Sequence, residues 1–98
     1  MLIVGGWFQV KAEEREEFLA GRHEAMRRSR TEPGCIDYTL SADPIEAGRV
    51  VLFERWESQE ALDAHLAAIR SAPQSAGGVA PTSASIMVYD ISAERPLG

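Results

Sequence analysis

The side chains best suited to chemistry gather in the second half of the chain, around His65. His65 lies three residues after Leu62 and four before Ile69, so we expect it on the inward stripe of a helix. Imidazole changes its charge near neutral pH, which makes His65 the best candidate for a general base in this chain. The alternative interpretation is a partly buried histidine that binds a backbone carbonyl, and the residues leave both open.

Leu52, Glu54 and Trp56 alternate along a predicted strand and therefore share one of its faces. Beside a cavity, the Trp56 indole could stack on an aromatic substrate and its ring NH could orient a substrate oxygen; the alternative is a core aromatic residue. Glu54 would be costly to bury alone. It would reach solvent, hold a nearby donor in place, or pair with an arginine such as Arg22, and we favour the ion pair.

Three further side chains are candidates for the same site. Tyr38 could donate a hydrogen bond to a phenolate or quinone oxygen, and Trp7 could contact substrate, but aromatic residues in strands are more often core residues. His23, on the predicted first helix, could point into the same cavity as His65, although a flanking position is favoured. Cys35 follows a turn and has no local basic cluster that would activate its thiol, so we interpret it as structural.

Six elements must position these residues, and their order defines the fold class. Apolar periodicity, capping residues and Pro/Gly breaks predict the order βαββαβ, the ferredoxin-like α+β arrangement with an antiparallel sheet. The predicted strands are 2–10, 35–40, 49–56 and 83–91, and the predicted helices are 12–30 and 58–70. The small-residue segment 71–82 is predicted to be loop or a broken turn of helix. A chain of 98 residues has room for one domain, 1–98.

The strands are apolar on both faces, which predicts a homodimer. Val50, Leu52 and Trp56 alternate with Val51 and Phe53 along the third strand. Right-handed crossovers place both helices on one face of the sheet, so the other face is left without a cover. A second copy of the chain is the simplest cover for that face.

Composition narrows the class of partner and the compartment. The net charge of -5 disfavours nucleic acid and anionic membranes as partners, because both need a basic face. No stretch approaches the roughly 20 apolar residues of a membrane span. A single cysteine excludes an intrachain disulfide and fits a reducing compartment, so a cytoplasmic location is expected. Neither a metal-binding spacing nor a phosphate-binding glycine loop occurs, so we expect no metal and no cofactor.

Three segments together closely resemble the antibiotic biosynthesis monooxygenase domain family. They are Thr31-Glu32-Pro33-Gly34-Cys35-Ile36-Asp37-Tyr38, then Glu54-Arg55-Trp56, then Ala61-Leu62 with Ala64-His65-Leu66. The resemblance covers about residues 2–70 and implies a dimeric α+β barrel with a pocket between helices and sheet. For part of the family it implies oxygenation of phenolic, anthrone or quinol substrates by dioxygen, without metal or flavin.

The resulting prediction is a cofactor-independent monooxygenase for small electron-rich aromatic substrates. His65 would remove a proton, and a dry cage lined by Trp56, Tyr38 and Trp7 would protect the reactive anion. Leu52, Glu54 and His23 would complete the substrate contacts. Two alternatives remain, because other branches of the superfamily degrade haem and many members have no assigned activity. They are a haem-binding or haem-degrading enzyme with His65 as axial ligand, and a non-catalytic dimeric module that binds a small ligand.

The sequence departs from the family pattern at two places. Val50 and Leu52 are apolar where active branches can carry an amide or another polar group on the Trp56 face. The segment 71–82, which commonly completes the pocket with larger residues, consists here mainly of Ser, Ala, Gly and Pro. Both departures keep the binding-module alternative open.

Overall fold

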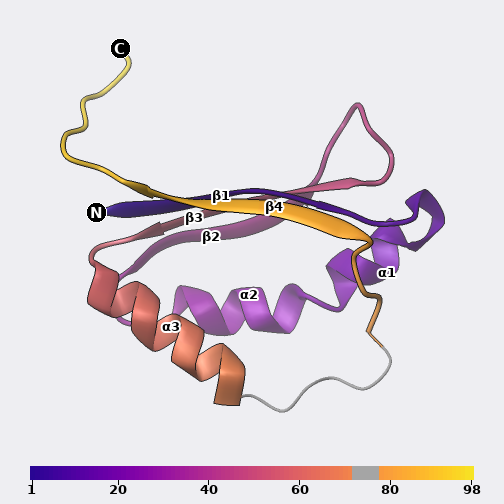
Figure 1. The fold of residues 1–98 in the computed structure, drawn as a ribbon, viewed down its shortest axis with the longest axis horizontal. Helices are drawn as coiled ribbons and strands as arrows, with labels where there is room; N and C mark the ends of the chain where they lie inside the picture. Colours follow the sequence, from indigo (N-terminus) through magenta and orange to yellow (C-terminus); the bar gives the residue numbers. More distant parts are fainter. Residues whose placement is uncertain (72–77) are drawn as a thin grey trace.

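Within residues 1–71 and 78–98, which the computed structural model describes, four strands form one antiparallel sheet and three α-helices lie on one side of it (Figure 1). The elements are β1 (Leu2–Gln9), a 3-10 turn η1 (Ala12–Glu14), α1 (Arg15–Ala20), α2 (His23–Arg30), β2 (Cys35–Ala42), β3 (Arg49–Trp56), α3 (Gln59–Ser71) and β4 (Ser83–Asp90). The strand order is β2-β3-β1-β4. The predicted ferredoxin-like α+β fold class is confirmed.

The first helical segment differs from the prediction. One continuous helix over 12–30 is wrong, because the chain forms η1, α1 and α2 with a break at Gly21 and Arg22. The Gly21 amide still donates to the Glu17 carbonyl, but the Arg22 amide donates to the nearer Leu19 carbonyl, both at 3.0 Å. Glycine is a poor helix former, and this tightened turn redirects the chain.

The predicted loop over 71–82 is only partly described. Ser71 ends α3, and residues 78–82 form neither helix nor strand, in agreement with the prediction for the segment 71–82. Residues 72–77 lie outside the described part of the chain.

The inward face of the sheet is set by β3 at its centre. Val50, Leu52, Glu54 and Trp56 are all buried on that face, under the helices. Strand alternation explains the pattern, since every second side chain points to the same side. The inward face therefore carries the core and, with Glu54, one buried carboxyl group.

A bulge in β2 turns Tyr38 toward the helices. Cys35 pairs with Trp56 and Asp37 pairs with Arg55, so Ile36 is an extra residue in the ladder. Tyr38 is consequently opposite Glu54, on the inward face. Without the bulge, simple alternation from Cys35 would place Tyr38 on the outer face.

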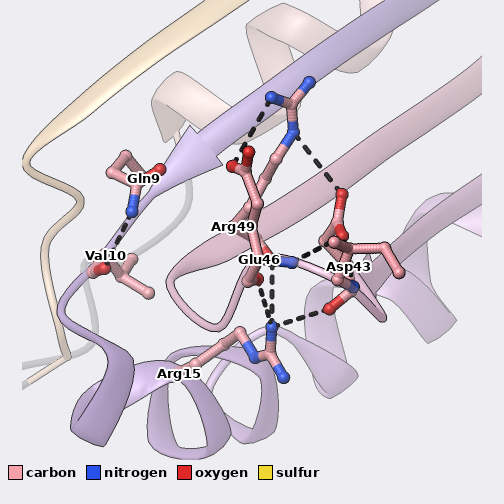
Figure 2. Close-up of polar contacts among 7 residues, drawn as sticks. Gln9, Val10, Arg15, Asp43, Glu46 and Arg49 are labelled. Atoms are coloured by element: carbon pink, nitrogen blue, oxygen red, sulfur yellow. Dashed lines mark hydrogen bonds and ion pairs between the residues drawn. The ribbon is translucent and has the colours of Figure 1, made fainter.

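Figure 2 shows how the Arg15 side chain of α1 reaches the connection between β2 and β3. Its Nη1 atom donates to the carbonyls of Asp43 and Glu46, each at 2.9 Å. The Asp43 carboxylate lies 3.7 Å from Nε of Arg49, the first residue of β3. Charged hydrogen bonds of this kind join α1 to the sheet. They hold α1 where its buried Phe18 packs into the core.

The outer face of the sheet has no helix over it (Figure 1). Phe53, Met87 and Tyr89 are 41%, 56% and 51% exposed there. They surround a shallow hollow that Trp7 also lines. Among the described residues, no helix is both long and apolar enough to cross a membrane.

Candidate active site

The site is built around His65, which α3 directs into the protein. Ser58 caps this helix through a 3.2 Å hydrogen bond from the Ala61 amide. Gly34, at a φ of +85°, lies so close that an added Cβ would be 2.5 Å from the Ala61 Cβ. This close contact brings Glu32, in the same turn, to α3. The His65 side chain is 2% exposed.

Glu32 fixes the orientation of the His65 ring. The Nδ1 atom of His65 lies 2.9 Å from Glu32 Oε1. A carboxylate only accepts hydrogen bonds, so Nδ1 is assigned as the protonated nitrogen. In the neutral imidazole, Nε2 then keeps its lone pair. Nε2 is the atom that faces Glu54, with Oε1 at 4.0 Å.

Glu54 is held by its neighbour on the same strand face. The ring NH of Trp56 donates to Glu54 Oε1 at 2.9 Å, and both side chains are buried. The predicted ion pair between Glu54 and Arg22 is wrong, since the ion pairs of the described residues do not join them. The indole NH is the donor that Glu54 needs in its buried position.

Two aromatic rings pack against the imidazole of His65. The Trp56 ring centre is 4.6 Å away at an interplanar angle of 35°, and the Tyr38 ring centre is 5.3 Å away at 61°. Burial, together with the Glu54 charge, raises the pKa of Tyr38 to about 12. Tyr38 therefore keeps its phenolic proton at neutral pH and can donate a hydrogen bond.

A cavity of about 660 Å³ lies between the sheet and the helices, next to these groups. Tyr38, Glu54 and His65 line it, together with the predicted contact residue Leu52. The apolar part of its wall includes Val4, Phe8, Phe18, Leu40, Leu62 and Val88. An apolar space with a few converging polar groups is typical of a small-molecule site.

Three predicted site residues do not line this cavity. Trp56 has no exposed surface and packs against His65, so it supports the imidazole from the core side. Trp7 lies on the outer face of the sheet, where the Arg49 guanidinium is 5.2 Å from its ring centre. His23 is exposed at the start of α2, outside the cavity wall.

Several residues at the site were not assigned to it from the sequence, and Arg22 was expected there only as a partner of Glu54. Glu32 contacts His65, and Phe18, Arg22 and Arg28 line the cavity. For Glu32 a signal existed, because it lies in the turn motif that carries the family resemblance. For Arg28 no signal existed, because the helix break at Gly21 decides which side it faces.

Comparison with known proteins decides the family. The family model described as antibiotic biosynthesis monooxygenase matches residues 1–70. The chain belongs to this family. The resemblance inferred from the turn, the strand end and the second helix is thereby confirmed.

Two curated relatives of this monooxygenase-family chain each match about two thirds of it. An uncharacterized protein of Synechocystis sp. is 39% identical over 64 residues, 65% of this chain. The match spans only 44% of that relative's own length. YcnE of Bacillus subtilis, named as a candidate monooxygenase, is 32% identical over 65 residues, 66% of this chain and 68% of YcnE.

Two solved structures share the fold of this chain. A candidate antibiotic biosynthesis monooxygenase from Deinococcus radiodurans has a TM-score of 0.75 at 21% identity, with 100% of this chain and 99% of that chain covered. The haem-degrader MhuD of Mycobacterium tuberculosis, solved with two haems bound in its active site, has a TM-score of 0.74 at 20% identity. It covers 98% of this chain and 100% of its own. At these identities the likeness concerns the fold alone.

In its neutral form, His65 keeps one lone pair, and an axial ligand to haem iron would use the same atom as a general base. An axial histidine needs a nitrogen that is open toward the iron. Here Nδ1 is engaged by Glu32, which leaves Nε2, with Glu54 Oε1 4.0 Å away, as the nitrogen for either role. In ranges 1–71 and 78–98, no group of three or more His, Cys, Asp or Glu side chains is arranged to hold a metal ion.

The pH dependence of stability should report on the buried Glu54. Burial raises the pKa of Glu54, and the Trp56 hydrogen bond opposes this only in part. The folded-state pKa thus lies above the unfolded value of about 4.3. The stability that protonated Glu54 contributes is present below this unfolded value and is lost as the pH rises through the folded pKa. Glu54→Gln removes the titration and keeps an oxygen that can accept from Trp56.

We therefore expect the free energy of unfolding of Glu54→Gln, relative to wild type, to increase as the pH rises from 4 to 8. Urea unfolding at a series of pH values measures this difference. Glu94→Gln, in the exposed C-terminal tail, is the matched control and should show a constant difference. A constant difference for Glu54→Gln as well would contradict the assignment.

Proposed function

We propose that the protein is a cofactor-independent monooxygenase that acts on small electron-rich aromatic compounds, such as quinols, anthrones or phenols, and that works as a homodimer. The observation that carries the proposal is the buried His65, held at Nδ1 by Glu32 and lining an apolar cavity beside Tyr38. Membership of the monooxygenase family and the likeness to YcnE support the reaction class.

The first step would be removal of a proton from the substrate. His65 Nε2 carries the lone pair that accepts the proton, and the Glu32 carboxylate stabilises the imidazolium that forms. The hydroxyl of Tyr38, which stays protonated, would donate a hydrogen bond to the oxygen on which negative charge develops. The apolar wall would keep water away from the anion.

The later steps use electrons from the substrate itself. With an anthrone, the carbanion gives one electron to dioxygen, and the radical pair joins to form a C–O bond. Protonation yields a hydroperoxide, and loss of water from it leaves a carbonyl where the CH₂ group was. One oxygen atom enters the product, the other becomes water, and the four electrons come from the CH₂ carbon. The protein would contribute proton transfer, positioning and a dry space.

Oxygen consumption with a panel of quinols and anthrones tests this proposal. We expect a rate above the protein-free reaction for at least one compound, because proton removal makes the substrate a better electron donor. With ¹⁸O₂ the product should carry one labelled oxygen. Heat-denatured protein is the control for autoxidation. Rates equal to the protein-free control for every compound would contradict a monooxygenase.

One observation favours a second candidate, the non-catalytic ligand-binding module. Trp7 and Trp56, which would line a catalytic cage, are both outside the cavity wall. A binding module would bind the same aromatic compounds in this cavity and consume no oxygen. Binding without oxygen uptake would therefore move this candidate ahead of the monooxygenase.

A further inference from the structure

Two arginines face the cavity without a carboxylate partner among the described residues. Arg22 and Arg28 both line it from the helical layer. Arg27 lies on α2 next to Arg28 but outside the cavity wall, and its guanidinium pairs with Glu24 at 3.0 Å. The chain as a whole has a net charge of -5, whereas these two arginines bring positive charge to one wall of the cavity.

Arg22 is held against the wall of the cavity. Its guanidinium carbon lies 4.7 Å from the ring centre of Phe18, and Phe18 is itself a buried part of the wall. This cation–π contact orients the side chain while leaving its N–H donors free. The Arg22 charge also lowers the pKa of Tyr38, against the stronger effect of burial.

Two acidic side chains share the wall and must be weighed against these arginines. Glu17 lines the cavity from α1, and like Arg22 and Arg28 it is exposed, so solvent screens all three charges. Glu54 is buried on the sheet, where Trp56 binds it. The two guanidinium groups offset both acids, and their planar forks match a carboxylate geometrically.

We propose that the cavity selects aromatic ligands that carry a carboxylate group, with Arg22 and Arg28 as the carboxylate-binding residues and the ring in the apolar space toward Tyr38 and His65. This substrate class refines the proposed function. The placement of the ligand ring beside His65 rests on that proposed function. The anionic group would be a part of the ligand that does not react. Its recognition would orient the phenolic or quinolic carbon toward the base.

A matched pair of ligands tests the proposal by binding alone. 1-Hydroxy-2-naphthoate and 1-naphthol differ by one carboxylate, and their affinities are measured by isothermal titration calorimetry. We expect the acid to bind more tightly. We also expect Arg22→Gln and Arg28→Gln each to weaken binding of the acid by about 3–30-fold, the range for charged hydrogen bonds near solvent. Binding of 1-naphthol should stay unchanged, and added salt should weaken only the acid.

Arg27→Gln is the matched control, since it removes a guanidinium from the same helix outside the cavity. Equal affinity for both ligands, or equal weakening of both by Arg22→Gln, would overturn the carboxylate proposal. A melting curve for each variant separates loss of binding from loss of folding, and if one arginine variant fails to fold, the other arginine variant and the salt series still decide.

The binding titrations and the oxygen-uptake assay together keep the two proposals apart. Selectivity for the acid without any oxygen uptake would uphold the carboxylate site and reject the monooxygenase. Oxygen uptake from quinols without carboxylate selectivity would reject only the carboxylate site.

Discussion

Replacing His65 with alanine is expected to lower the rate of enzymatic oxygen uptake by about 10²–10⁴-fold, the usual contribution of a general base. The ring is 2% exposed, Glu32 holds Nδ1 at 2.9 Å, and the side chain lines the cavity. The substitution removes the proton acceptor while the apolar wall and Tyr38 remain. The rate is measured by an oxygen electrode with the most active compound of the panel, after subtraction of the protein-free rate.

The alanine variant also opens a space in the core, so a second variant is needed. His65 packs between Trp56 and Tyr38, with ring centres 4.6 Å and 5.3 Å away, and its removal costs packing as well as chemistry. His65→Gln fills more of this space and supplies no base. We expect both variants to lose activity to a similar extent while the glutamine variant melts closer to wild type. If both fold and turn over at the wild-type rate, His65 is a core residue and no base.

The order of the elements could be predicted because it depends on local patterns. Each strand alternates and each helix repeats its apolar residues over three to four positions, and these signals need no knowledge of distant contacts. The break between α1 and α2 was missed because one glycine inside a good helical pattern lowers helix stability only by about 1 kcal/mol. Tertiary contacts such as those of Arg15 then decide whether the helix continues.

The candidate site was predictable where alternation settles which residues share a face. Leu52, Glu54 and Trp56 share a face as expected, yet alternation cannot tell which of them reaches the cavity. Tyr38 reaches the inward face only through the bulge at Ile36, and such an irregularity leaves no mark in a simple periodic pattern.

The contact between Glu32 and His65 was outside the reach of local reasoning. The two residues are 33 positions apart, so only the assembled fold brings them together. For Trp7, the difficulty was to predict on which face of the sheet it lies. Its strand was predicted, but both faces of that strand are apolar, and the pattern does not say which one the helices cover.

Phe53→Asp is expected to convert a dimer into a monomer. Phe53, Met87 and Tyr89 form an exposed apolar patch on the outer face of the sheet, which no described helix covers. If a second copy covers this patch, a two-fold axis places the new aspartate of each protomer in the same interface. Two carboxylates would then lose water without a partner, a cost of several kcal/mol that opposes association.

Light scattering of the wild-type protein at micromolar concentration should give about twice the chain mass of 10.7 kDa, and Phe53→Asp should give the mass of one chain. Ile45→Asp is the matched control, because Ile45 is also apolar and is 88% exposed, but lies in the connection between β2 and β3. It should leave the dimer intact. A monomeric wild type that unfolds cooperatively would contradict the dimeric barrel, and a dimeric Phe53→Asp variant would place the interface elsewhere. Because the cavity lies on the helical side, the monomeric variant keeps its residues, and its oxygen uptake would show whether the site needs the second copy.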